Sequence, residues 1–140
     1  MNFSNKDGGK IIFELIKTIQ DKKDFLSEVD GKIGDGDHGI NMNKGFTMTY
    51  CKVNGKDYDM TTAFSVLGDT LLEDIGGSMG PLYGAFFDGL SEASEDHDVI
   101  DKKTFQKMIH TALEAIQDIG NAKRGDKTLL DTLIPAVEAY

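Results

Sequence analysis

The sequence predicts an all-α fold. Segment after segment carries apolar residues every three to four positions, the spacing that places them on one face of a helix. Glycine-containing polar stretches separate these segments at 30–39, 76–80 and 120–128. No segment combines strict apolar-polar alternation with the β-branched residues typical of strands. We therefore expect one helical domain over residues 1–140.

The first two predicted helices flank a glycine-rich segment. An amphipathic helix begins near Ile12 and extends to about Val29. The following segment, Asp30–Gly39, has four glycines in ten residues, which forbids a stable helix and permits tight turns. The helical pattern resumes near His38 and continues to about Tyr50.

Two further helices are separated by the Gly-Gly pair at 76–77. Either Asp59 or Thr61 can cap the first of them, because short oxygen-bearing side chains accept hydrogen bonds from the first-turn amides. Ser78 is well placed to cap the second, and Pro81 is tolerated in its first turn.

The last two predicted helices carry strong apolar faces. One begins near Asp101 and ends at Gly120. We expect Asp126 to cap the other and Pro135 to kink it. The apolar helical pattern is still running at Tyr140, so we expect the chain to be incomplete at its C-terminus.

Composition narrows the class of protein. The formal net charge is −9 and the pI is near 4.7, which argues against general binding to nucleic acid or anionic lipid. The single cysteine, Cys51, excludes an internal disulfide. Neither a secretion signal nor an apolar run of roughly 20 residues is present. We expect a cytoplasmic protein that binds neither membranes nor nucleic acid directly.

Three aspartates predict a metal site. Asp30, Asp35 and Asp37 lie within eight residues on glycine-rich backbone, so their carboxylates can converge. A divalent cation that prefers oxygen ligands, such as Mg²⁺, relieves the repulsion between them. The spacing differs from a calcium-binding EF-hand loop, whose closing Glu would fall at Asn41. The structural alternative is that the aspartates are turn residues and that Asp37 caps the next helix.

The other two polar segments are weaker candidates. Residues 76–80 precede a helix, so their amides and a hydroxyl could receive an anion, although helix caps alone explain this segment better. The segment Gly120–Thr128 can offer backbone groups and the cationic side chains of Lys123, Arg124 and Lys127, although solvated charge is the ordinary explanation for these three. In an antiparallel helical array, the loops after alternate helices gather at one end. We expect all three segments to meet there. His38 could donate to a phosphate, bind metal or lie beside the site.

Three ordered motifs resemble the nucleotide-binding L subunit of dihydroxyacetone kinases. They are GDGDHGINM at Gly34–Met42, GGSMGPLYG at Gly76–Gly84 and GDKTLLD at Gly125–Asp131. The resemblance implies an antiparallel helical barrel of eight helices, of which about six are present here. It also implies a cytoplasmic phosphotransferase subunit.

The resemblance implies roles for particular residues. Two Mg²⁺ ions that bridge the phosphates of ADP or ATP would be held by Asp30, Asp35 and Asp37. Contacts along the phosphates and ribose would come from His38, Gly39, Ile40, Asn41, Ser78 and Met79. The adenine would be bordered by Gly120 and Leu129.

The resemblance further implies phosphoryl transfer to dihydroxyacetone held covalently by a histidine of a separate K subunit. In the bacterial branch, a phosphohistidine M subunit of the phosphotransferase system recharges the bound nucleotide, whereas other branches exchange ATP freely. Whether the chain also forms a homodimer is left open by the resemblance. Two alternatives are a fatty acid kinase nucleotide domain, which usually has Thr in place of His38, and a regulatory helical domain without catalysis.

Overall fold

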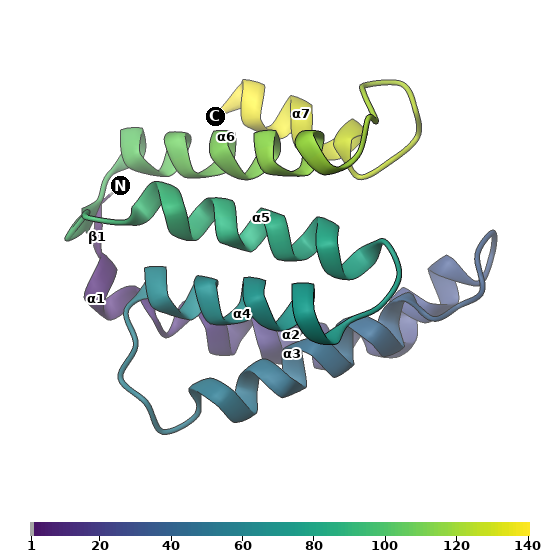
Figure 1. The fold of residues 1–140 in the computed structure, drawn as a ribbon, viewed down its shortest axis with the longest axis horizontal. Helices are drawn as coiled ribbons and strands as arrows, with labels where there is room; N and C mark the ends of the chain where they lie inside the picture. Colours follow the sequence, from purple (N-terminus) through teal and green to yellow (C-terminus); the bar gives the residue numbers. More distant parts are fainter. Residues whose placement is uncertain (1) are drawn as a thin grey trace.

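The chain folds as a row of antiparallel helices (Figure 1). The computed structural model describes residues 2–140. Over these residues, six helices of at least ten residues follow one another: α2 Ile11–Asp30, α3 His38–Val53, α4 Met60–Asp74, α5 Met79–Ser94, α6 Lys102–Ile119 and α7 Leu130–Ala139. Most contacts join helices that are consecutive in the chain. The prediction of an all-α fold is confirmed.

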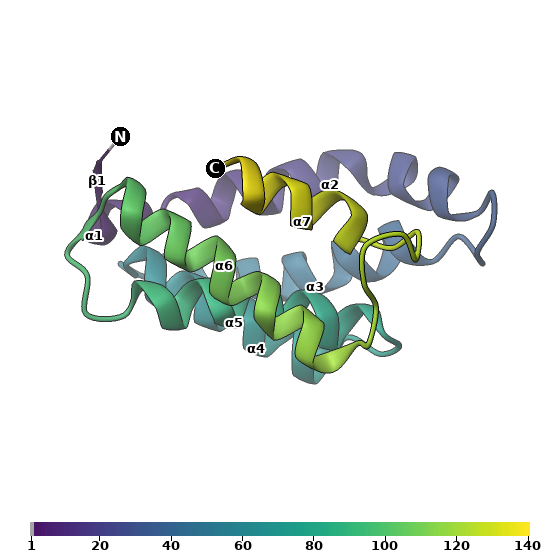
Figure 2. The ribbon, with the colours of Figure 1, turned by 90° about the horizontal axis from the view of Figure 1, so that it is seen from above.

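The row of helices curves into the predicted barrel. Seen from above, α7 lies over the same side of the molecule as α2, with α4 and α5 opposite (Figure 2). The curvature leaves an apolar cavity of about 210 Å³ inside. Its lining comes from α2, α3, α5 and α7 and the residue before α7: Leu15, Thr18, Ile19, Met42, Phe46, Tyr83, Phe86, Phe87, Leu129 and Leu133.

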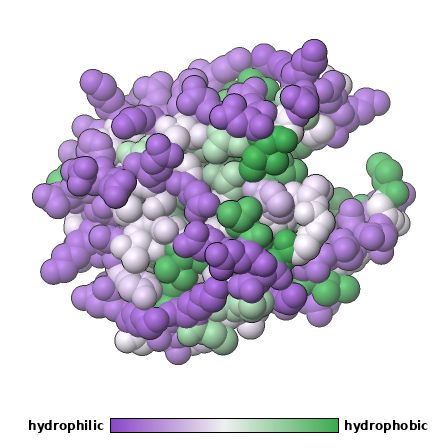
Figure 3. All heavy atoms as spheres, in the orientation of Figure 1, coloured by the Kyte–Doolittle hydropathy of each residue, from purple (hydrophilic) through white to green (hydrophobic). Residues whose placement is uncertain are grey.

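The core is densest where α4, α5 and α6 pack together. Leu67 and Leu71 of α4 and Met108 and Ala112 of α6 are fully buried. Burying a leucine or methionine side chain stabilises the fold by about 1.5 to 3 kcal/mol. Figure 3 shows hydrophilic residues over much of one face, with hydrophobic ones between the helices. The periodic apolar residues thus form the core that their spacing predicted.

A short N-terminal element was not expected. β1 (Phe3–Ser4) pairs antiparallel with β2 (Val99–Ile100), and α1 (Asn5–Gly8) follows. The Asn5 side-chain amide donates to Thr61 Oγ1 at 2.8 Å and to the His97 carbonyl at 2.9 Å. Strands of two residues are too short to show alternation, so the sequence pattern could not predict them.

One predicted helix cap is confirmed, and a second cap stands where only a helix start was predicted. Asp59 accepts a hydrogen bond from the Thr62 amide at 2.7 Å, so Asp59 rather than Thr61 caps α4. Asp101 accepts from the Thr104 amide at 2.7 Å and caps α6. Each bond satisfies one of the amides that have no partner inside the helix.

The prediction that Asp126 caps the last helix is wrong. Helix α7 begins at Leu130, and the Asp126 carboxylate accepts from the Lys123 amide at 2.9 Å inside the loop. The Leu130 amide donates to Thr128 Oγ1 at 3.2 Å instead. Pro135 lies within α7, and the expected kink there stays a prediction.

Two further findings concern the surface. Cys51 is exposed on α3. Across the described part of the chain, each helix is too short or too polar to cross a bilayer.

Candidate nucleotide and metal site

Three connecting segments lie at the same end of the molecule. They are residues 31–37 between α2 and α3, 75–78 between α4 and α5, and 120–129 between α6 and α7. All three are at the right in Figure 1 and remain there in the perpendicular view of Figure 2. The expectation that alternate loops gather at one end is confirmed.

The aspartate loop, residues 30–37, brings three carboxylates together. Asp30 is the last residue of α2, and Asp37 immediately precedes α3. One carboxylate oxygen from each of Asp30, Asp35 and Asp37 lies within 4.8 Å of the other two. Gly36 has a φ of 78°, a conformation that a residue with a side chain rarely adopts. The glycine therefore lets the chain reverse between the two exposed aspartates.

Amide donors surround these carboxylates. The His38 amide donates to Asp30 Oδ2 and the Asp37 amide to Asp35 Oδ1, both at 3.4 Å. The Asn41 side chain donates to Asp37 Oδ2 at 2.7 Å. Asp37 stands at the N-cap position of α3 but makes no capping hydrogen bond. The structural alternative, in which Asp37 serves as the cap, therefore lacks the bond that defines it.

The start of α3 is pressed against α2. A Cβ atom on Gly39 would lie 1.9 Å from the Lys23 carbonyl oxygen and 2.7 Å from Ser27 Oγ. Ser27 Oγ is buried and, among the described side chains, has no hydrogen-bond partner. A buried hydroxyl without a partner is costly and rare in folded proteins, and a bound ligand or water next to the aspartate loop would satisfy it. Sequence reasoning missed Ser27, although its position three residues before Asp30 places both on one side of α2.

The donor set fits a hard divalent cation. All three converging groups are carboxylates, and none of the ion pairs in the described residues involves them. Mg²⁺ prefers oxygen ligands and keeps water or phosphate oxygens in its remaining positions. The loop is exposed enough to leave such positions accessible to a ligand. The assignment of the aspartates as metal ligands stays a prediction.

The glycine turn, residues 75–78, presents the start of α5 to the same end. Gly77 and Ser78 are exposed, and Met79 is half-buried. Ser78 makes no capping hydrogen bond, so its hydroxyl and the first amides of α5 remain able to meet an anion. A Cβ atom on Gly80 would lie 2.0 Å from the Ile75 carbonyl oxygen, so α5 starts directly against the end of α4.

His38 contacts Tyr83, a residue that sequence reasoning did not assign to the site. The two rings meet edge to face, with centroids 5.9 Å apart and planes at 61°. Burial raises the pKa of the Tyr83 hydroxyl above its ordinary value. The contact joins α3 to α5 and so connects the aspartate loop with the glycine turn. Such a tertiary contact leaves no local sequence signal.

The other predicted contacts with phosphate and ribose lie along the first turn of α3. Gly39 is buried, Ile40 is exposed and Asn41 is half-buried. Asn41 supports Asp37 through the hydrogen bond described above. The first turn of a helix carries amides without intrahelical partners and the positive end of the helix dipole. This turn is therefore suited to lie beside phosphate oxygens.

Gly120 and Leu129, the two predicted adenine contacts, line one small cavity. Its volume is about 130 Å³, and the other lining residues are Leu82, Ile116, Ala122, Thr128 and Leu130. Most of this surface is apolar, which suits the faces of an aromatic ring. Leu82 was not assigned to the site from sequence, although it lies in the second motif.

Asp131 shapes the loop that carries this cavity. Its carboxylate accepts from the Gly125 amide at 2.7 Å and from the Thr128 amide at 3.0 Å. These hydrogen bonds lower the pKa of Asp131 below its ordinary value. Arg124 pairs with Glu138 at 3.3 Å and fixes the loop to α7. Of the three cationic side chains of this segment, Arg124 is thus engaged within the protein.

Comparisons with known proteins agree on one family. The model of the DAK2 domain matches residues 32–140. An ADP-binding subunit DhaL of a PEP-dependent dihydroxyacetone kinase from Listeria innocua is 39% identical over 122 residues, which is 86% of this chain and 61% of the relative. The corresponding subunit from Escherichia coli is 34% identical, with 84% of this chain and 57% of the relative covered.

A solved structure shows the same fold. The dihydroxyacetone kinase of C. freundii, in complex with AMP-PNP and Mg²⁺, superposes with a TM-score of 0.78 at 25% identity, over 99% of this chain and 25% of that one. The chain spans about three fifths of the length of the curated relatives named above. Because the family model covers more than three quarters of the sequence, the chain belongs to the DAK2 domain family.

Proposed function

We propose that this chain is the nucleotide-binding part of a dihydroxyacetone kinase and holds ADP or ATP through two Mg²⁺ ions. The observation that carries the proposal is the convergence of Asp30, Asp35 and Asp37 within 4.8 Å. The glycine turn and the small apolar cavity lie at the same end. The related subunits are named as ADP-binding, and the C. freundii enzyme was solved with AMP-PNP and Mg²⁺.

In this proposal each segment has a distinct task. The three carboxylates anchor the metal, and Asn41 keeps the Asp37 carboxylate in place. When bound, Mg²⁺ neutralises charge on the phosphates during transfer. The amides at the starts of α3 and α5 and the Ser78 hydroxyl orient phosphate oxygens. The cavity bordered by Gly120 and Leu129 takes the adenine. None of these side chains needs to carry a proton.

The acceptor and the phosphoryl donor belong to partners in this proposal. Dihydroxyacetone is held by a K subunit, and a phosphohistidine M subunit of the phosphotransferase system recharges the nucleotide. Support comes from the relatives, which are named as subunits of PEP-dependent kinases. The chain alone would then bind nucleotide without turnover. We propose that residues 1–140 act as one nucleotide-binding domain in the cytoplasm, and that other subunits supply the acceptor.

Calorimetric titration with ADP, in the presence and absence of Mg²⁺, tests this proposal. We expect binding only with Mg²⁺, because without the cation the phosphates would face three carboxylates. A version extended to the full length of the relatives should be titrated in parallel. If neither version binds ADP, the nucleotide-binding proposal is wrong and a regulatory helical domain becomes the better reading.

A further inference from the structure

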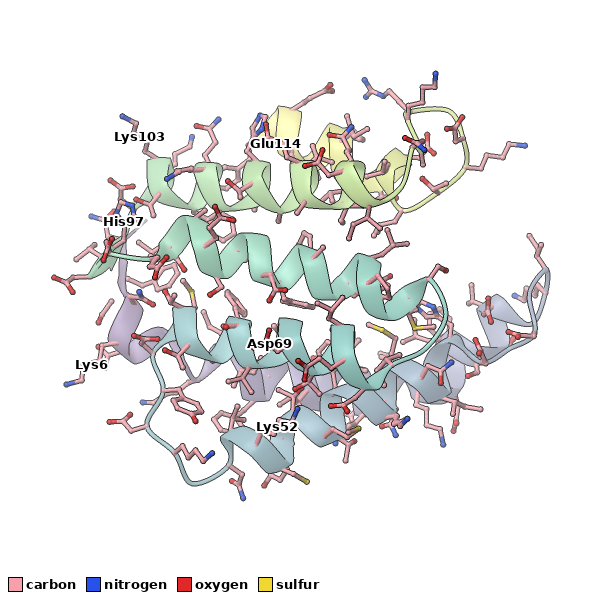
Figure 4. All side chains as sticks on the ribbon, in the orientation of Figure 1. Lys6, Lys52, Asp69, His97, Lys103 and Glu114 are labelled. Atoms are coloured by element: carbon pink, nitrogen blue, oxygen red, sulfur yellow. The ribbon has the colours of Figure 1, made fainter. Side chains whose placement is uncertain are left out.

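Two lysines of α3 hold the last residue of α4. Lys52 Nζ donates to Asp74 Oδ2 at 3.2 Å and to Thr70 Oγ1 at 3.0 Å. Lys44 Nζ donates to the carbonyl oxygen of Asp74 at 3.2 Å. Figure 4 shows Lys52 between α3 and α4. Both lysines therefore meet at the point where α4 ends and the glycine turn begins.

The two lysines supply donors and positive charge to the C-terminal end of α4. The last carbonyl groups of a helix lack intrahelical donors and carry the negative end of the helix dipole. Helix α4 has no basic residue in its own last turn. The Lys52 and Asp74 side chains are 43% and 33% exposed, and so open an ion pair contributes little to global stability. Together with the bonds to Thr70 Oγ1 and to the Asp74 carbonyl oxygen, however, it ties the end of α4 to α3 in one position.

The position fixed is that of the glycine turn. A Cβ atom on Gly45 would lie 2.5 Å from Leu71 Cδ2 and 3.0 Å from Ile75 Cγ1, so α3 lies directly against the end of α4. Gly80 in turn packs under the Ile75 carbonyl oxygen. Movement of Asp74 and Ile75 relative to α3 would therefore move the start of α5.

Helix α3 also begins at the aspartate loop. It thus connects both phosphate-facing segments: its first turn adjoins Asp37, and Lys44 and Lys52 hold the residue that leads into the glycine turn. A ligand whose phosphates contact both segments depends on their separation. A metal ion bound by Asp30, Asp35 and Asp37 alone does not, because these residues all belong to the single connection from the end of α2 to the start of α3.

We propose that Lys44 and Lys52, acting through Asp74, are positioning residues that set the glycine turn against the aspartate loop for binding of the nucleotide phosphates. The inference rests on the proposed nucleotide-binding function. It assigns to the outer face of α3 a role that none of the sequence motifs carries.

The test compares two ligands on the same variants. In Lys44→Met/Lys52→Met, the affinity for Mg-ADP by calorimetry should fall about 10-fold, the loss expected when phosphate-binding groups are misplaced. The affinity for Mn²⁺ alone, followed by electron paramagnetic resonance, should stay unchanged. Arginine at both positions keeps the donors and should restore much of the Mg-ADP affinity. Lys107→Met, on α6 at the opposite end, is the matched control and should bind like the parent protein.

The possible outcomes distinguish the positioning role of the two lysines from the proposed nucleotide binding on which it rests. Absence of Mg-ADP binding by both the parent protein and its extended version overturns the proposed function and this inference together. Parent protein that binds, with a double variant of equal affinity, overturns only the positioning role. An equal loss of Mn²⁺ and Mg-ADP affinity also overturns it, because that result would mean general loosening of α3. Asp74→Asn gives a second check and should show the same selective loss.

Discussion

Two groups of carboxylates in residues 2–140 differ in geometry: those of the aspartate loop converge on one point, and those of an acidic groove do not. The aspartate loop brings oxygens of three residues within 4.8 Å of one another. The acidic groove between α4 and α5, a cavity of about 470 Å³, is lined by Asp69, Asp88, Glu92 and Glu95 together with Thr61, Thr62, Ser65 and Ser91. Figure 4 shows Asp69 along the middle of α4, outside the aspartate loop.

The two groups relieve repulsion in different ways. In the loop, the glycine-rich backbone lets carboxylates converge, and nearby amides donate to them. In the groove, the carboxylates come from α4, from α5 and from the residue after α5, and no three of them in the described structure converge as those of the loop do. Burial, together with the charge of Asp69, raises the pKa of Asp88 to about 6. Convergence, rather than the number of acidic residues, therefore distinguishes a metal site from a solvated face.

The largest expected effect is on Mg-ADP affinity, and it should arise from a substitution in the aspartate loop but not from one in the acidic groove. Asp35→Asn removes a charged ligand and should weaken Mg-ADP binding by at least about 100-fold, because divalent-cation affinity depends on the number of charged ligands. Asp69→Asn, the matched change in the acidic groove, should leave the affinity as it is. Calorimetry on both variants checks this. Equal effects at the two positions would contradict the assignment of the loop as the metal site.

A smaller effect tests the backbone of the loop. Gly36→Ala places a side chain at a φ of 78° and should weaken Mg-ADP binding about 10-fold, since the left-handed conformation costs about 1 to 2 kcal/mol with a Cβ present. Gly55→Ala, at a φ of 75° between α3 and α4 at the other end, is the control. It should lower the free energy of unfolding similarly without a change in affinity. A Gly36 variant that binds normally would show that the reversal is not needed.

The acidic groove should appear in the pH dependence of stability. The raised pKa of Asp88 means that the folded state binds this proton more tightly than the unfolded chain, whose pKa is near 3.8. The resulting stabilisation is complete below pH 4 and is lost as the pH rises through about 6. For a half-exposed group we expect the loss to be about 1 kcal/mol. Asp88→Asn lacks this ionisable group. In urea unfolding from pH 4 to 7, the free energy of unfolding of the variant should therefore rise relative to that of the parent protein.

The smallest effect concerns the loop without metal. Asp35→Asn should raise the free energy of unfolding by a few tenths of a kcal/mol in chelator, because it removes repulsion between exposed carboxylates. The gain should shrink at high salt. Thermal unfolding at two ionic strengths measures it. A destabilised variant would mean that Asp35 holds the loop together as a turn residue.

Local sequence patterns predicted the helices and singled out the three aspartates, whereas the tertiary contacts became known only from the structure. Apolar spacing placed α2 to α6 to within a few residues, since helix periodicity is a property of neighbouring positions. The start of α7 was misplaced because Asp126 and Asp131 are both plausible partners for loop amides. The Tyr83 ring beside His38 depends on residues far apart in the chain, as does the contact of Lys52 with Asp74. No periodicity records such pairs.

The packing of each helix mainly against its neighbours in the chain has a consequence for cooperativity. Such a row can open from its ends, so α2 and α7 should exchange their amide hydrogens with solvent sooner than α4 and α5. A nucleotide held between the segments 30–37 and 120–129 would join the two ends of the row. Ligand binding would then slow exchange most in the helices that open first, and a chain of adjacent pairs would become a closed cooperative unit.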